Sequence, residues 1–190
     1  MTPDETTLAL NTRNTRVTFS STLGPLVVRG KFRELHGQIS LPNADIEQAT
    51  VALDVVAGSI DTGLAMRDRH LRGISFLDVA HTPLISYRSE RVTRQNGTLL
   101  VDGMLSLRGV ERDISTALPV AWAEQQGVAG TLSLATQLLI TRADYALGVP
   151  RGIDVFNPIF LAVGAVVAVQ VEVVVPANRL LPALLPALGR

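Results

Sequence analysis

Residues 84–101 read LISYRSERVTRQNGTLLV, and this stretch indicates the fold most directly. Apolar and polar residues alternate from Ile85 onward, as they do when one face of a β-strand is buried. Asn96 and Gly97 follow this alternation and favour a type I′ turn, because both residues tolerate a positive φ. A second apolar alternation begins at Leu99, so the stretch predicts an antiparallel β-hairpin.

The same period of two continues over most of the chain from Val17 onward and predicts a mainly β structure. Gly30 and Gly37 are expected to bend one long strand. Consecutive antiparallel strands without long helices between them hide their edges by closing into a barrel, and about eight strands leave room for one ligand. The expected strands lie at residues 17–19, 26–41, 51–55, 85–95, 99–107, 114–122, 132–140 and 167–175.

The composition argues against a nucleic-acid-binding protein. Hydrophobic residues make up 47% of the 190 residues and charged residues 18%, with a mean hydropathy of +0.29. Some of this apolar surplus is expected to line a cavity. Lys plus Arg and Asp plus Glu both number 17, so the broad positive field that favours nucleic acid or an anionic bilayer is absent. The chain has no cysteine, which excludes disulfides and thiolate metal sites.

One domain is expected from this length. Residues 1–15 would form an N-terminal extension, 16–176 the barrel and 177–190 an apolar tail rich in proline and leucine. The prolines are expected to prevent a continuous helix in the tail, whereas its leucines require burial. The tail would cover the barrel end or a neighbouring subunit, or else touch a membrane or plug the lumen.

The N-terminal residues are acidic and lack the basic start and apolar run of a secretory leader, so a cytoplasmic protein is expected. The most apolar stretch, 159–175, is interrupted by Gly164, Gln170 and Glu172, and valines occupy every second position towards its end. This pattern favours a strand over a membrane helix, so no stable membrane insertion is expected. A neutral surface with an apolar tail is consistent with a homodimer.

A charged segment, SIDTGLAMRDRHLRGISFLDV at residues 59–79, reads as a short helical insert between two strands. The chain lacks the G-x-S-x-G, P-loop, G-x-G-x-x-G and H-E-x-x-H motifs, so compact catalytic signatures are missing. His36, His70 and His81 stand far apart, without the i, i+4 pairing that places two imidazoles on one metal. We therefore expect no metal site and no cofactor.

Several motifs carry a resemblance to a known family. They are S-I-D-T-G at 59–63, R-D-R-H-L at 67–71, F-L-D at 76–78, P-L-I-S-Y-R-S at 83–89, V-R-G-K-F at 28–32, G-M-L-S-L-R-G-V at 103–110 and R-A-D-Y-A-L-G at 142–148. In order and spacing the chain resembles the YceI-like family of lipid- and polyisoprenoid-binding proteins. The resemblance implies an all-β fold, a single antiparallel lipocalin-like β-barrel with a short helical insert. It also implies a polyisoprenoid, an isoprenoid quinone or another long-chain lipid as ligand.

The candidate site combines an apolar lumen with a polar rim. We expect the following residues to contact the ligand in the lumen or as a lid above it: Phe19, Phe32, Leu53, Leu71, Phe76, Leu77, Ile85, Tyr87, Leu105, Leu107, Leu118, Leu138 and Ile140. Arg67 and His70 are candidates for contact with a head group, as are Arg29 and Arg142, which lie in matched motifs.

A structural interpretation of the rim stays open. Asp61, Arg67, Asp68 and Arg72 could instead anchor the insert to the barrel through charge-assisted hydrogen bonds. The function that we predict is non-catalytic carriage or sequestration of a long apolar lipid. One alternative is an enzyme that uses the rim cluster around His70 for general acid-base chemistry on a hydrophobic substrate. The other is a filled barrel that serves as an interaction module through its C-terminal leucines.

Overall fold

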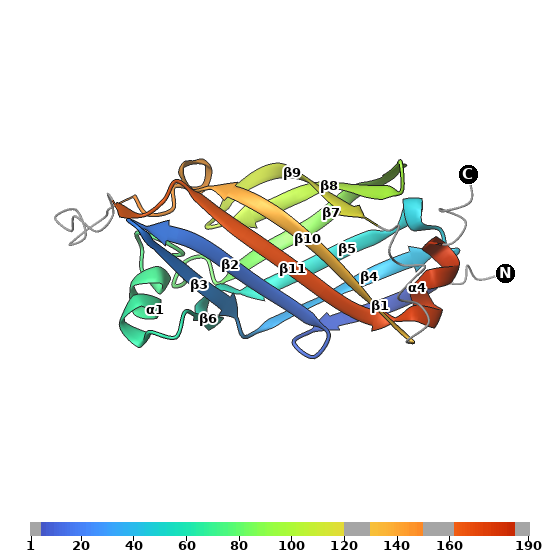
Figure 1. Ribbon diagram of the computed structural model, residues 1–190, viewed down its shortest axis with the longest axis horizontal. Coiled ribbons are helices and arrows are strands. Elements are labelled where there is room, and N and C mark those ends of the chain that lie inside the picture. The colour runs from blue at the N-terminus through green and yellow to red at the C-terminus, as the bar shows by residue number, and fades with distance from the viewer. Residues whose placement is uncertain (1–4, 120–129, 150–161, 185–190) are drawn as a thin grey trace.

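The computed structural model describes residues 5–119, 130–149 and 162–184, and its strands form two antiparallel sheets (Figure 1). The strands are β1 (Glu5–Asn11), β2 (Thr15–Leu23), β3 (Leu26–Phe32), β4 (Leu35–Pro42), β5 (Thr50–Val56), β6 (Ile60–Asp61), β7 (Leu84–Gln95), β8 (Thr98–Leu107), β9 (Val110–Pro119), β10 (Thr131–Thr141) and β11 (Val166–Pro176). One sheet has the order β1-β4-β5-β7-β8-β9, and the other has the order β10-β11-β2-β3-β6.

The two sheets enclose one apolar interior, so the predicted antiparallel β-barrel class is confirmed. At the seam between β9 and β10, the Thr136 hydroxyl donates a hydrogen bond to the Ala117 carbonyl oxygen at 3.2 Å. The hydroxyls of Thr116 and Thr136 are also hydrogen-bonded to each other across this seam. Side chains thus connect β9 and β10, which are edge strands of different sheets within the described residues.

The hairpin predicted from residues 84–101 is confirmed by β7 and β8, which pair in antiparallel register. Asn96 and Gly97 have φ values of 50° and 71°, the positive pair that a type I′ turn requires. Arg108 and Gly109 repeat this geometry between β8 and β9, with φ values of 55° and 71°. Two tight turns of one kind therefore connect three consecutive strands, and an irregularity between Ser89 and Arg91 shifts the β7–β8 register further along.

The prediction of one bent strand over residues 26–41 is wrong, because β3 and β4 are separate strands in different sheets. The chain leaves one sheet at Arg33 and Glu34 rather than at a glycine. Gly30 has another role: a Cβ at this position would lie 2.4 Å from Cζ of Phe19. The missing side chain therefore makes room for an aromatic ring inside the barrel.

The structure also has strands that the alternation pattern did not reveal. β1 lies within the segment expected to be an N-terminal extension, and it pairs with β4 from Glu5↔Pro42 to Asn11↔His36. Its residues Leu8 and Leu10 are buried in the core. The two-residue strand β6 pairs with the end of β3. With the division of β3 from β4, these strands explain why about eight were expected and the described residues form eleven.

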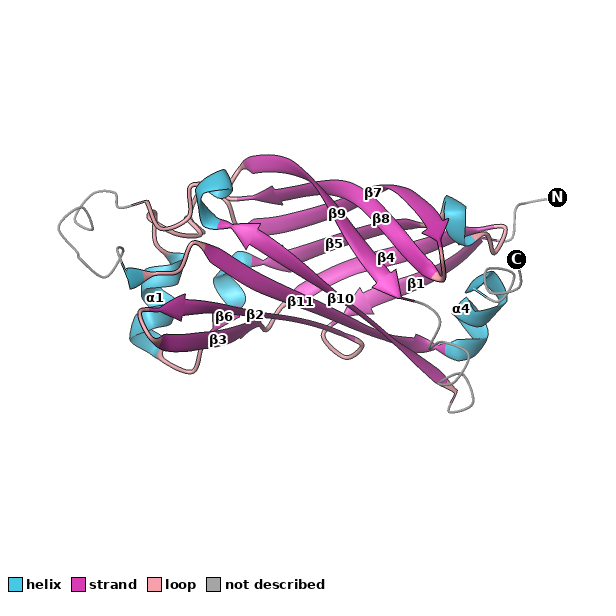
Figure 2. Cartoon of the chain, turned by 45° about the horizontal axis from the view of Figure 1, so that its top comes forward, coloured by secondary structure: helices cyan, strands magenta, loops and turns pink. Residues whose placement is uncertain are grey.

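The helical elements lie at the two ends of the barrel (Figure 2). The insert forms α1 (Ala65–Arg72) at one end, and α4 (Ala177–Leu184) lies at the other. The short 3₁₀ turns are η1 (Ile46–Gln48), η2 (Ala57–Ser59) and η4 (Arg142–Tyr145). In the described parts of the chain, every helix is too short or too polar to cross a membrane.

Residues 177–184 of the C-terminal segment form the helix α4, which continues past Pro182 contrary to the expectation that the prolines would prevent a continuous helix, and residues 185–190 lie outside the described residues. Pro182 lies within α4, where its missing N–H removes a single intrahelical hydrogen bond. Leu180 and Leu184 are almost fully buried and belong to the larger core cluster, which also contains Leu41 and Leu132. This packing makes α4 a cover for that end of the barrel, and ligand entry is therefore expected at the opposite end.

Candidate ligand-binding site

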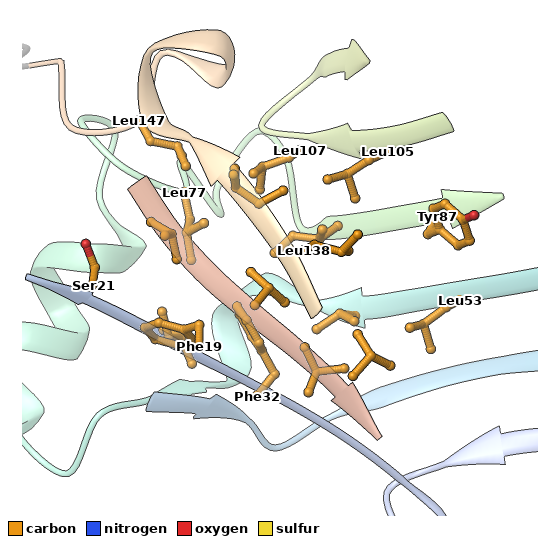
Figure 3. Close-up of a pocket in the computed structure, with 18 of the residues that line it drawn as sticks. Phe19, Ser21, Phe32, Leu53, Leu77, Tyr87, Leu105, Leu107, Leu138 and Leu147 are labelled. Carbon is orange, nitrogen blue, oxygen red and sulfur yellow. The ribbon is translucent and has the colours of Figure 1, made fainter. Parts of the chain in front are cut away.

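A cavity of about 630 Å³ lies between the two sheets and reaches α1. Figure 3 shows labelled side chains such as Phe19, Leu53 and Leu138, which come from different strands, around this space. The volume falls within the roughly 300–1,000 Å³ typical of small-molecule sites. The barrel interior is hollow, which argues against the alternative of a filled interaction module.

The cavity surface is almost entirely apolar, as burial of a hydrocarbon chain requires. The polar or charged side chains that take part in the lining are Ser21, Thr22, Arg67, His70, Tyr87, Thr116, Thr136 and Arg142. Arg67 and His70 belong to α1 at one end, whereas Tyr87, Thr116 and Thr136 belong to the strands. A ligand with one polar end and a long apolar remainder matches this distribution.

The structure places every residue predicted for the lumen in the cavity wall. These thirteen are Phe19, Phe32, Leu53, Leu71, Phe76, Leu77, Ile85, Tyr87, Leu105, Leu107, Leu118, Leu138 and Ile140. Parity explains the strand residues, because alternate side chains of a strand point to the same face. Their contact with a ligand stays a prediction.

Sequence reasoning missed several other lining residues. Val167, Val169, Val171 and Val173 of β11 line the cavity, and their alternation is visible in the sequence. Leu64 and Met66 also line it, from the start of the insert. A strand pattern could have revealed the valines. Leu64 and Met66 could not be found in this way, because they follow no regular apolar spacing that would mark them as lining residues.

Tyr87 carries a buried polar atom in this apolar wall. Its hydroxyl is inaccessible to solvent and has no hydrogen-bond partner in the described structure. Burial, reinforced by the negative charges of Asp102 and Glu90, raises the pKa of Tyr87 to about 12. The phenol therefore stays neutral at physiological pH. Gly103 leaves space beside it, since a Cβ there would lie 2.8 Å from the phenolic oxygen.

The rim insert is anchored by hydrogen bonds centred on Thr62. Asp68 accepts a hydrogen bond from the Thr62 backbone N–H at 2.9 Å. Arg67 donates from Nε to the Thr62 hydroxyl at 2.7 Å and from its terminal nitrogen to the Thr62 carbonyl oxygen at 2.8 Å. These contacts support the structural interpretation of the rim charges, while Arg67 also lines the cavity.

The remaining rim charges are also engaged in local contacts. Arg72 donates to the carbonyl oxygens of Gly58 at 2.7 Å and Ile60 at 2.9 Å. The Gly63 N–H and the guanidinium of Arg33 both donate to Asp61 and lower the pKa of its carboxyl group. The insert is thus tied to η2 and β6 by charge-assisted hydrogen bonds, and the carboxylate of Asp61 is held in its ionised form.

The four head-group candidates occupy different positions. Arg67 and His70 line the cavity, but Arg29 is exposed on β3 and does not. Arg142 lines the cavity, yet its guanidinium donates to the carbonyl oxygens of Gly164 at 2.5 Å, Val163 at 3.0 Å and Leu147 at 3.2 Å. Burial lowers the pKa of Arg142. Of the four candidates, Arg67 and His70 therefore remain the better placed for a head group. Arg142 is bonded to three carbonyl oxygens, and Arg29 lies outside the cavity lining.

Metal-ligating side chains are dispersed over the described residues. Within these ranges, no three His, Cys, Asp or Glu side chains gather in a group that could hold a metal ion. The carboxylates near α1 accept hydrogen bonds from Thr62, Gly63 and Arg33. The two antiparallel sheets around one apolar cavity define a lipocalin-like β-barrel fold with room for a hydrophobic ligand.

Comparison with known proteins identifies the family. The sequence model of the YceI-like domain matches residues 8–175, so the chain belongs to the YceI-like family. A UPF0312 protein of Shewanella denitrificans is 35% identical over 96 residues, which cover 50% of each chain. A UPF0312 protein of Azotobacter vinelandii is 34% identical over 98 residues, or 51% of each chain. The chain thus spans about half the length of the curated relatives that it matches.

Solved structures show the same fold at low sequence identity. BcnA of Burkholderia cenocepacia matches with a TM-score of 0.71 and 20% identity, over 85% of this chain and 96% of BcnA. A polyisoprenoid binding domain from Saccharophagus degradans matches with a TM-score of 0.62 and 19% identity, over 88% of this chain and 96% of that domain. The YCEI protein of Campylobacter jejuni matches with a TM-score of 0.61 and 19% identity, over 78% and 84% of the two chains.

Proposed function

We propose that this protein binds a long apolar lipid of the polyisoprenoid or isoprenoid-quinone kind within its barrel and carries or sequesters it. The observation that carries the proposal is the hollow, apolar interior of about 630 Å³ with polar residues at one mouth. The name of the Saccharophagus degradans neighbour, a polyisoprenoid binding domain, supports this class of ligand. Membership in the YceI-like family supports it independently.

The physical balance places most of the affinity in the apolar tail of the ligand. Each methylene group moved from water into an apolar cavity contributes roughly 0.8 kcal/mol. An exposed ion pair at the rim contributes only about 0.2–1 kcal/mol. Arg67 and His70 therefore orient a head group, and the wall residues supply the binding energy.

A test of cavity binding uses two adjacent positions on β10. Leu138 lines the cavity, whereas Leu139 points outward. Leu138→Trp is expected to fill part of the cavity and reduce uptake of a fluorescent prenyl probe at least tenfold, while Leu139→Trp keeps wild-type uptake. Native mass spectrometry of protein purified from its source, followed by lipid extraction, identifies the natural ligand. Equal uptake by the two variants, or protein that takes up no prenyl lipid, would contradict the proposal.

We further propose that the site binds its ligand without catalysis. His70 lines the mouth and is exposed, so its removal is expected to change prenyl-probe affinity by less than about fivefold. If His70→Ala instead abolishes turnover of a hydrophobic substrate that the wild type converts, the rim is an enzyme site. Cytoplasmic location and a homodimer stay predictions, which localisation of the tagged full-length protein and light scattering can check.

A further inference from the structure

Large apolar side chains are exposed around the α1 end of the barrel. Leu26 and Val27, at the tip of the β2–β3 hairpin, are 64% and 54% exposed. Leu64 and Met66, at the start of α1, are 49% and 70% exposed. Figures 1 and 2 both place the tip of this hairpin and α1 at the same end, opposite α4. Exposed apolar groups concentrated at one end are typical of an interaction surface.

This exposed surface is continuous with the lumen. Leu64 and Met66 take part in lining the cavity while a large share of each side chain faces solvent. Leu23 and Val28, which flank the hairpin tip, also line the cavity. A hydrocarbon chain that enters between the hairpin and α1 would contact exposed apolar side chains first and buried ones afterwards.

Basic side chains accompany this apolar surface. Arg29 on β3 and Arg69 on α1 are both exposed, and neither forms an ion pair with an acidic residue that the structure describes. Two acidic residues next to α1 are already engaged: Asp61 pairs with Arg33 at 2.7 Å, and the buried Asp68 accepts a hydrogen bond from the Thr62 backbone N–H. Although the whole chain has no net charge, the exposed Arg29 and Arg69 place two positive charges without an acidic partner among the described residues at the α1 end.

We propose that the mouth surface, defined as Leu26, Val27, Arg29, Leu64, Met66 and Arg69, docks reversibly on a lipid bilayer that carries anionic head groups. The apolar side chains enter the region between head groups and acyl chains, and the two arginines contact lipid phosphates. A bilayer fits better than a folded partner protein, because the surface surrounds an apolar opening that a lipid must traverse. This inference rests on the proposed lipid-binding function and adds the place where the ligand enters.

The test measures binding of the whole protein to vesicles that contain no prenyl lipid. Flotation with vesicles of phosphatidylcholine and phosphatidylglycerol is expected to recover the protein, and phosphatidylcholine alone recovers much less. Arg29→Ala and Arg69→Ala should each weaken binding to the anionic vesicles about fivefold, a loss that high salt reproduces. The double variant Leu26→Asp/Val27→Asp should weaken vesicle binding at least tenfold. Neither residue lines the cavity, so this loss would not come from a changed lumen.

Leu139→Asp is the matched control, because Leu139 on β10 is 71% exposed, close to the value for Met66, but is outside the mouth surface. It should bind vesicles as the wild type does. Absence of vesicle binding, or an equal loss in Leu139→Asp, would overturn the proposal, and binding only to a protein partner would do so as well. Uptake of a prenyl probe in vesicle-free solution tests the cavity separately, and the Leu26→Asp/Val27→Asp variant should retain it.

Discussion

The carboxylate of Asp68, buried on α1, accepts a hydrogen bond from the backbone N–H of Thr62 at 2.9 Å. The same carboxylate also accepts from the Thr62 hydroxyl, which in turn accepts from Arg67. One threonine thus joins two charged side chains of the helix to the strand that precedes it. The relationship fixes the position of α1 over the cavity mouth, where Arg67 and His70 lie.

Asp68→Ala is therefore expected to destabilise the protein by about 1–3 kcal/mol, because it leaves the partly buried N–H and hydroxyl of Thr62 without their acceptor. Urea unfolding measures the loss, and hydrogen exchange should show faster exchange confined to residues 60–72. Arg69→Ala on the same helix is the control, since Arg69 is exposed and its change should alter stability by less than about 0.5 kcal/mol. Equal effects in both variants would show that Thr62 does not anchor the helix.

Gly103 on β8 is expected to tolerate no side chain. A Cβ at this position would lie 2.3 Å from the Arg88 carbonyl oxygen and 2.8 Å from the Ser89 Cα, and backbone cannot move aside cheaply. Gly103→Ala should cost about 1–3 kcal/mol in the free energy of unfolding. Gly58→Ala is the matched control, because nothing lies within 4 Å of its added Cβ. Thermal unfolding of the two variants in parallel compares the positions, and a stable Gly103→Ala protein would contradict the strand geometry.

Leu180 on α4 tests whether the C-terminal helix belongs to the folded core. Leu180 is almost fully buried in the cluster that contains Leu132, so Leu180→Ala should cost about 2–5 kcal/mol. The neighbouring Arg179 is exposed, and Arg179→Ala is expected to have little effect on stability. Chemical denaturation of the two variants measures this difference in the free energy of unfolding. A small effect at Leu180 would mean that α4 does not cover the barrel end in solution.

Sequence patterns predicted the cavity wall better than the path of the chain between strands. Parity alone places Leu53, Ile85 and Leu138 inside, because a period of two permits only two faces and apolar residues occupy one of them. The break between β3 and β4 was missed because Arg33 and Glu34 carry none of the Gly, Pro or Asn signals that mark turns.

Long-range contacts limited the prediction of the rim. The sequence motif around Arg142 suggested contact with a head group, but the guanidinium bonds the carbonyl oxygens of Val163 and Gly164, more than twenty residues away. Such a contact depends on how two loops meet in space. In contrast, the anchoring of α1 by Asp68 and Thr62 joins residues six positions apart, and the charge pattern of the insert already indicated it.

The buried phenol of Tyr87 predicts a specific dependence of stability on alkaline pH. Because its pKa rises to about 12 in the folded protein, above the value of about 10 in an unfolded chain, the unfolded state releases its proton first. Stability contributed by the neutral phenol is complete below pH of about 10 and is lost as the pH rises towards 12. Denaturant unfolding between these pH values should therefore show that the free energy of unfolding falls more steeply with pH for the wild type than for Tyr87→Phe.

Tyr87→Phe also removes a hydroxyl that has no hydrogen-bond partner in the described structure, so at neutral pH the variant should be as stable as the wild type or more stable. Tyr145→Phe is the comparison, because burial also raises the pKa of Tyr145. Phenolate absorbance during titration assigns the late-titrating group: its removal by Tyr87→Phe supports the buried phenol in the cavity wall. A wild-type phenol that titrates near 10, or a Tyr87→Phe variant with an unchanged alkaline slope, would show that this hydroxyl is hydrated.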